Sequence, residues 1–442
     1  MRAMLATALA ALAVVAAGCG GGGSAGLASG ATLGQSAAQL VPSDATAFVS
    51  VDSNLGSAQW QRLDDLTKSF PARAKLLDEI NAQLQMKGLS WKDDVVPALG
   101  NELDVAAFGS GSNVEYVAYT KPHDAAKLSA LASKVSEGND KYTVQQIGGW
   151  SVVADAQDLF DKVRAAANGT SLADGAAFKA AWSSVSGDAL ARAYVNGSAT
   201  GIGTLKLTGG KADWYAARVA AKGDALQVDV TRHPQGTTAA TARPLLGDVP
   251  SGAALAVAFH GAGDLLAQLA ATKVASQLPV KQLAPLLTGD GVLYVRSASL
   301  IPDVAIELTP KDPQAALVAA RGLLQQLSGK LGPLQVTAQL SGTKLVIADG
   351  PAAANALRGG SKLVNDSAYR DAVKAAGAPA KTTLLAYADV TALAPVIQLA
   401  LGALGGKSDP SIGANLQHVG TVVAWLGKTN GTARYRLWVQ PK

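Results

Sequence analysis

Short apolar stretches separated by turn residues recur along the chain, and their spacing predicts both strands and helices. The stretch TAFVSVDSN, beginning at Thr46, alternates apolar and polar positions as a strand does. A helix over 57–68 follows, and Pro71 begins a second helix that ends at Gly88. Further on, ELDVAAF pairs with VEYVAYT, and YTVQQI pairs with WSVVA, as hairpins. Hairpins joined through helices predict an α+β fold, a mainly antiparallel sheet with helices packed on one face.

The same succession of blocks occurs twice along the chain. LVPSDATAFVSV from Leu40 matches DVPSGAALAVAF from Asp248, and SLADGAAFKAAW from Ser171 matches KLVNDSAYRDAV from Lys362. Four further blocks match in the same order, with a period far longer than that of a solenoid repeat. The chain is therefore predicted to contain two tandem homologous domains. Their predicted bounds are 39–235 and 246–442.

The N-terminal residues have a different pattern. Met1 and Arg2 precede an apolar run from Ala3 to Ala17, which is typical of a secretory signal and shorter than the roughly 20 residues of a membrane span. Small residues up to Gly18 then lead into Cys19, the only cysteine of the chain. We therefore expect a signal peptide at 1–18, with cleavage between Gly18 and Cys19. Residues 19–38 are predicted to be a lipidated cysteine followed by a Gly/Ser-rich tether.

The stretch VVAAGCGGGG around Cys19 resembles the bacterial lipoprotein box, in which the cysteine receives diacylglycerol and a peptidase cuts just before it. The resemblance implies a protein held by lipid on Cys19 at the outer face of the bacterial cytoplasmic membrane. Lipidation also removes an unpaired thiol, which exported proteins rarely keep. The alternative is an ordinary signal peptide, after which the protein is secreted.

Three blocks resemble a family of bacterial surface proteins catalogued as a domain of unknown function. They are LVPSDATAFVSVD, VVPALGNELDVAAF and IGGWSVVADAQD. The shared positions include Pro42, Asp44, Pro97, Gly100 and Asp155. The resemblance implies a secreted or membrane-anchored protein, and its motifs are structural, so it brings no catalytic residue and no ligand.

Composition narrows the function classes. Hydrophobic residues make up 48% of the chain and charged residues 16%, which favours a folded protein with a large core. The net charge of +5 comes from 38 basic and 33 acidic residues without a basic run, and aromatic residues are 5%, so nucleic-acid binding is not expected. No cysteine follows Cys19, which excludes disulfides and thiolate metal sites from the folded part. No cofactor and no metal are predicted.

No catalytic constellation stands out. The histidines are isolated from one another in sequence, and the carboxylate pairs such as Asp64-Asp65 and Asp93-Asp94 lie on predicted helices beside Lys and Arg, as solvated helix faces do. Asp52 ends a strand, but the matching position of the second repeat is His260 and not an acid. An enzyme, such as an envelope hydrolase, is therefore the third interpretation and not the first.

The first interpretation is a non-catalytic binding or cell-envelope interaction protein, whose partners are the membrane and an envelope protein. The second is a carrier of a lipid or another apolar ligand in a cavity between sheet and helices. The apolar segment from Val390 belongs to the second repeat alone and supplies the candidate lining. The candidate lining residues are Leu393, Val396, Ile397, Leu399 and Leu401.

Overall fold

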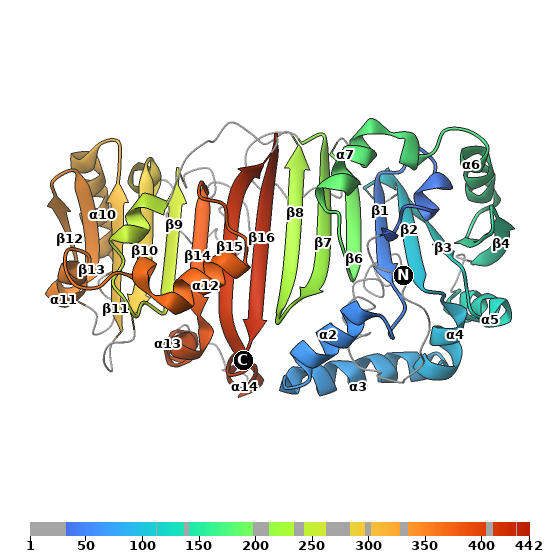
Figure 1. Cartoon of the computed structure of the whole chain (residues 1–442), viewed down its shortest axis with the longest axis horizontal. Helices are drawn as coiled ribbons and strands as arrows, with labels where there is room; N and C mark the ends of the chain where they lie inside the picture. Colours follow the sequence, from blue (N-terminus) through green and yellow to red (C-terminus); the bar gives the residue numbers. More distant parts are fainter. Residues whose placement is uncertain are drawn as a thin grey trace. The chain divides into compact units, whose positions relative to one another are not determined.

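The chain folds into two compact units, each built on an eight-stranded antiparallel sheet (Figure 1). The computed structural model describes residues 32–111, 113–136, 141–197, 212–233, 243–261, 283–296, 302–327, 335–403, 410–429 and 431–442. The first unit holds the described residues up to 233, and the second holds those from 243 onward. The predicted α+β class and the antiparallel sheet are confirmed.

In the first unit the strand order is β8-β7-β6-β1-β2-β3-β5-β4, and every neighbouring pair is antiparallel. Both predicted hairpins are present, as β2 with β3 and β4 with β5. The strands are β1 Ala47–Asp52, β2 Glu102–Ser110, β3 Asn113–Thr120, β4 Thr143–Ile147, β5 Trp150–Ala154, β6 Ala191–Asn196, β7 Trp214–Lys222 and β8 Ala225–His233.

In the second unit the order is β16-β15-β14-β9-β10-β11-β13-β12, again antiparallel throughout. If β9–β16 are renumbered from 1 to 8, this strand order is the same as that of the first unit. The strands are β9 Leu255–His260, β10 Asp290–Arg296, β11 Asp303–Thr309, β12 Val336–Ser341, β13 Lys344–Asp349, β14 Leu384–Asp389, β15 Val419–Thr429 and β16 Thr432–Pro441.

Local contacts repeat along with the strand order. An isolated bridge joins Pro42 to Ser171 in the first unit and Pro250 to Lys362 in the second. These are the positions that the sequence blocks align, so residues matched by the blocks and by the strand ladders are called equivalent below. By this rule Ser50, which pairs with β2 and β6, is equivalent to Ala258, which pairs with β10 and β14.

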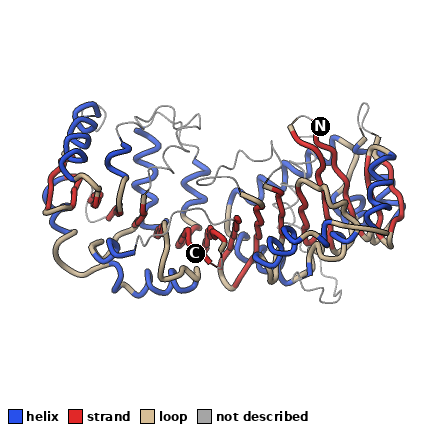
Figure 2. Tube along the Cα trace, turned by 90° about the horizontal axis from the view of Figure 1, so that it is seen from above, coloured by secondary structure: helices blue, strands red, loops and turns tan. Residues whose placement is uncertain are grey.

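Helices cover both faces of each sheet (Figure 2). We call the face that carries Phe48 and Tyr194, or Tyr294 and Tyr387 in the second unit, the aromatic face. Over it lie α6 Gln157–Ala167, α7 Ala176–Ser184, α11 Gly350–Ala356 and α12 Ser367–Ala375. The opposite face carries α2 Ala58–Thr67, α3 Pro71–Met86, α4 Val96–Ala98, α5 Ala125–Val135, α10 Pro313–Leu327 and α13 Val390–Ala403.

The prediction of helices on one face is therefore wrong. The prediction fails because the central strands are buried on both faces of the sheet. In β1 five of six residues are buried, and in β2 six consecutive residues are buried. Apolar side chains such as Val51 and Val105 alternate with Phe48 and Ala106, so each face needs its own cover.

The packed chain begins earlier than predicted. Residues 32–40, which we call the N-terminal strap, contain a short 3-10 turn at Ala37–Gln39, and Leu33, Ala37 and Ala38 are buried against the first unit. The predicted tether at 19–38 is therefore too long at its C-terminal end, because small residues that suit a flexible linker also suit close packing. Residues 1–31, including Gly18 and Cys19, lie outside the described residues.

Candidate functional site

The predicted lining residues on α13 form part of an apolar cluster on the opposite face of the second sheet. Leu393 is buried against Ala254 and Val295, and Val396 and Ile397 pack at the edge of this cluster. The side chains of Leu399 and Leu401 lie outside the described residues. Neither of the two cavities described below is lined by this helix.

A row of polar side chains crosses the aromatic face of the first unit. Its members are cross-strand neighbours on adjacent strands, and directly opposed residues of an antiparallel pair project from the same face. Ser50, Asp104 and Tyr119 are fully buried, and Arg192 is 1% exposed. We call this set the polar row. From β7 to β3 it consists of Arg218, Arg192, Ser50, Asp104 and Tyr119.

The two arginines at one end of the polar row are held by carbonyls and by an acid. Arg218 donates to the carboxylate of Asp229 at 2.7 Å and to the carbonyl oxygen of Ser186 at 2.5 Å. Arg192 donates to the carbonyl oxygen of Gly187, and its guanidinium lies 5.8 Å from the centre of the Trp182 ring. Burial and the charge of Arg218 lower the pKa of Arg192. The arrangement holds two like charges beside each other within the fold.

The acid end of the polar row is less well satisfied. Burial raises the pKa of Asp104 well above its ordinary value, and the negative charge of Glu102 adds to the shift. The Ser50 hydroxyl donates to Glu102 at 3.1 Å. Within the described chain, the carboxyl oxygens of Asp104 and the hydroxyl of Tyr119 have no hydrogen-bond partner. Asp104 is therefore a buried acid that favours its neutral, protonated form.

The N-terminal strap closes over this part of the sheet. The backbone N–H of Gly34 donates to the Glu102 carboxylate, and the Trp182 indole N–H donates to the Leu33 carbonyl oxygen at 3.0 Å. Gly34 has a φ of +78°, and a Cβ there would lie 2.4 Å from Cζ2 of Trp182 and 2.9 Å from Cε1 of Phe48. Only glycine fits at this close approach.

The second unit shows that the fold does not require the polar row. Four of its five positions are apolar there, and the fifth is an acid. The residues equivalent to Arg218, Arg192, Ser50, Asp104 and Tyr119 are Trp425, Leu385, Ala258, Val292 and Glu307. The row is thus a property of the first unit alone.

Glu307, the acid of the second unit, has a cation of its own. Lys344 donates to Glu307 at 2.6 Å and to Asp248 at 2.9 Å. Burial raises the pKa of Glu307 and the hydrogen bond from Lys344 opposes that shift. Since Glu307 is 4% exposed, Lys344 neutralises a charge that the fold has taken out of water.

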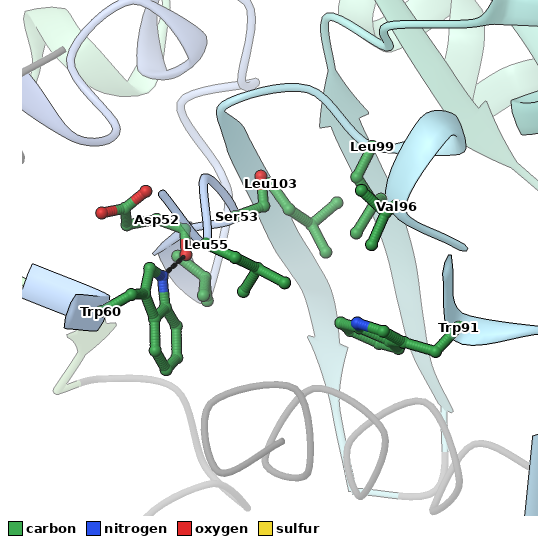
Figure 3. Close-up of a pocket in the computed structure, with 9 residues that line it drawn as sticks. Asp52, Ser53, Leu55, Trp60, Trp91, Val96, Leu99 and Leu103 are labelled. Atoms are coloured by element: carbon green, nitrogen blue, oxygen red, sulfur yellow. Dashed lines mark hydrogen bonds between the residues drawn. The ribbon is translucent and has the colours of Figure 1, made fainter. Parts of the chain in front are cut away.

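The first cavity lies in the first unit, between the sheet and the helices on its opposite face. Its volume is about 10 Å³. Figure 3 shows Trp60, whose indole N–H donates to the Asp52 carbonyl oxygen at 2.6 Å, on one side of it, and Trp91 and Leu99 on the other. The space is sufficient for at most one water molecule, so the cavity is a packing defect and not a ligand site.

The second cavity is a groove of about 420 Å³ in the second unit, which we call the α12 groove. Most of its lining is apolar, and two cations stand beside it. The lining residues are Leu246, Val364, Tyr369, Arg370, Val373, Lys374 and Ala378. Its volume is within the range of small-molecule sites.

Several acidic residues of the predicted helices pair with nearby cations. The Arg73 guanidinium contacts Asp64, Lys68 lies 3.0 Å from Asp65, and Lys127 lies 3.3 Å from Asp94. These contacts agree with the interpretation of the acidic pairs as solvated helix faces. Among the described residues no group of three or more His, Cys, Asp or Glu side chains is arranged to hold a metal ion. In the same part of the chain, no helix has the length and apolarity that a bilayer crossing requires.

Comparison with known proteins returns no family model, no curated protein and no solved structure that matches this chain.

Sequence reasoning missed both the polar row and the α12 groove. The row had a weak signal, a charged residue inside an otherwise apolar strand, as in ELDVAAF for Asp104 and LARAYV for Arg192. No local sequence pattern indicates the α12 groove. It becomes visible only when Val373 is compared with its equivalent Trp182.

Proposed function

We propose that this protein is a non-catalytic bacterial lipoprotein that is anchored by lipid on Cys19 and binds a component of the cell envelope. The signal-like N-terminus and the cysteine that ends it support the anchor. The N-terminal strap is the observation that carries the proposal, because it joins the segment leading from Cys19 directly to the core of the first unit through Leu33 and Gly34.

The strap also shortens the connection to the membrane. Twelve residues, 20–31, separate Cys19 from Thr32, the first described residue, which precedes the buried Leu33. A flexible Gly-rich chain of that length has a root-mean-square reach of about 20 Å. Two acyl chains supply stable membrane attachment at about 0.8 kcal/mol per buried CH₂. The first unit is then held close above the lipid headgroups of the outer face of the cytoplasmic membrane.

We also propose that the two units arose by duplication and form tandem homologous domains of the bacterial surface-protein family named above. The shared strand order and the matching bridges at Pro42 and Pro250 support this proposal. A binding role is favoured over a catalytic one because Arg192 and Asp104, two charged groups of the polar row, are buried. The acid Asp104, which is fully buried, has no open path to a substrate.

The anchor is tested by Cys19→Ala, with Ser24→Ala as the matched control in the same segment. The wild type and Ser24→Ala should fractionate with membranes, and intact mass should show diacylglycerol on a mature N-terminal cysteine. Cys19→Ala should appear in the medium or in the soluble envelope fraction. Membrane retention of Cys19→Ala, or a mature wild-type N-terminus beyond residue 19, would refute the anchor.

The second candidate function is a carrier of an apolar ligand. The α12 groove is the observation that favours it, because it is large enough for a ligand. The carrier proposal therefore places its site at α12, on the aromatic face of the second unit. The apolar side chains of α13 that were predicted to line the site pack on the opposite face.

A further inference from the structure

We propose that the α12 groove binds a single-chain anionic amphiphile, with its acyl chain against the apolar lining and its phosphate or carboxylate head between Arg370 and Lys374. The proposal goes beyond membrane anchoring, because it concerns a site in the second unit that is far along the chain from Cys19. It gives the carrier function a place and a class of ligand.

The apolar part of the groove comes from three neighbouring segments. Leu246 belongs to the short helical turn Arg243–Gly247, and Val364 belongs to the turn Leu363–Asn365. Tyr369 and Val373 lie on α12, one turn apart, and Tyr369 packs edge-on against Tyr387 of the sheet at 5.2 Å between ring centres. This packing fixes the wall, since Leu246 is 1% and Tyr369 6% exposed.

The charge of the groove is positive. Arg370 and Lys374 are exposed and four residues apart, so they stand on the same side of α12. Neither is within ion-pair distance of a carboxylate in the described part of the chain. Asp366 also lies close in sequence, but its carboxylate accepts from the Ser251 hydroxyl at 2.6 Å and from the Gly252 N–H at 3.0 Å. Asp371 is on α12 but does not line the groove.

In the first unit, a side chain fills the position that the groove occupies in the second unit. Trp182, equivalent to Val373, fills it with an indole that stacks on Phe178 at 5.0 Å and bonds to the Leu33 carbonyl. Lys179 is equivalent to Arg370, and residues 35–39 of the strap are equivalent to the turn Arg243–Gly247, which supplies Leu246 to the groove. The residues equivalent to Leu33 and Gly34 lie outside the described part of the second unit. This position of the fold therefore accommodates a large, flat, apolar group that makes one hydrogen bond. Val373 is smaller than tryptophan and leaves that space open.

The test is calorimetric titration of the soluble Cys19→Ala protein with dodecyl phosphate below its micelle concentration. Inorganic phosphate and dodecylphosphocholine serve as the head alone and the zwitterionic amphiphile. The expected result is saturable binding of dodecyl phosphate, at least tenfold weaker binding of dodecylphosphocholine, and no measurable binding of phosphate alone. Binding of inorganic phosphate as tight as that of dodecyl phosphate would overturn the proposal in favour of a free-anion site.

Two variants locate the binding in the groove. Val373→Trp copies the first unit and should abolish binding while both cations remain. The double variant Arg370→Gln/Lys374→Gln should weaken dodecyl phosphate at least tenfold and leave dodecylphosphocholine unchanged. Lys179→Gln, the equivalent change in the first unit, is the matched control and should bind as the wild type does.

Thermal unfolding identifies a variant that fails to fold. If Val373→Trp does not fold, the exposed double variant decides the question by itself. Wild-type affinity in the double variant, or absence of dodecyl phosphate binding in the wild type, would refute the proposal. Neither result bears on lipidation of Cys19, which is measured by fractionation.

Discussion

The indole N–H of Trp182 and the carbonyl oxygen of Leu33 are joined by a buried hydrogen bond of 3.0 Å that spans 149 residues of sequence. Through it the N-terminal strap becomes part of the core of the first unit. Gly34, the next residue, then donates its N–H to Glu102. The N-terminal strap is therefore stabilised by the same contacts that close the polar row.

Gly34→Ala should destabilise the protein by about 3 kcal/mol, because a Cβ at this position meets Trp182 at 2.4 Å and the φ of +78° disfavours alanine. Gly223→Ala is the control, since Gly223 has a φ of +62° and a Cβ there would have no neighbouring atom within 4 Å. It should cost only about 1 kcal/mol. Denaturant unfolding measures both. Equal losses would show that the strap is not tightly packed.

Asp104→Val should raise the unfolding free energy by about 1–3 kcal/mol. The substitution removes a buried acid without a hydrogen-bond partner in the described chain and installs the residue found at the equivalent position, Val292. Asp104→Asn keeps a buried polar group and should give little or no gain. A destabilised Asp104→Val variant would instead indicate that Asp104 has a partner that the fold depends on.

Asp52 should make the first unit less stable as the pH rises. Burial is the main cause that raises its pKa from 3.8 to about 6, against hydrogen bonds from the Ser57 hydroxyl and the Asn54 N–H. A raised folded-state pKa means that the folded state binds the proton more tightly than the unfolded state. The stability linked to this proton is complete below about pH 4 and is lost as the pH rises through about 6.

The measurement is the unfolding free energy of wild type and Asp52→Asn between pH 4 and pH 7.5. Relative to the variant, the wild type should lose up to about 3 kcal/mol across this range. Asp65→Asn, on the exposed face of α2, should leave the pH dependence of the wild type unchanged. Parallel curves for wild type and Asp52→Asn would show that Asp52 titrates normally.

Lys344→Met should destabilise the second unit by about 1–3 kcal/mol at neutral pH, because it leaves the buried carboxylate of Glu307 without its cation. The loss should shrink in acid, where Glu307 is protonated. The double variant Lys344→Met/Glu307→Gln should recover most of the stability, since it removes both charges. A double variant as unstable as Lys344→Met would show that the ion pair is not the cause.

Local elements followed from the sequence because their signals are local. The turn glycines Gly148 and Gly149 both have positive φ and join β4 to β5 as predicted. The segment from Val390 is a helix as predicted, because its apolar run is long and ends near glycines. The number of covered faces was predicted wrongly, because alternation in a strand reveals a single buried face only when the other face is polar.

By itself the sequence determined the strands, the hairpins and the recurrence of one block order, since each depends on side-chain periodicity and turn chemistry within a few residues. Only the tertiary structure decided that Leu33, Ala37 and Ala38 belong to the core. It also decided that Arg192, Ser50 and Asp104 form one row, and that Trp182 fills a space which Val373 leaves open. These relationships depend on which strands are neighbours and on the volume left between layers. Both are set by contacts between residues more than fifty positions apart, where sequence spacing carries no information.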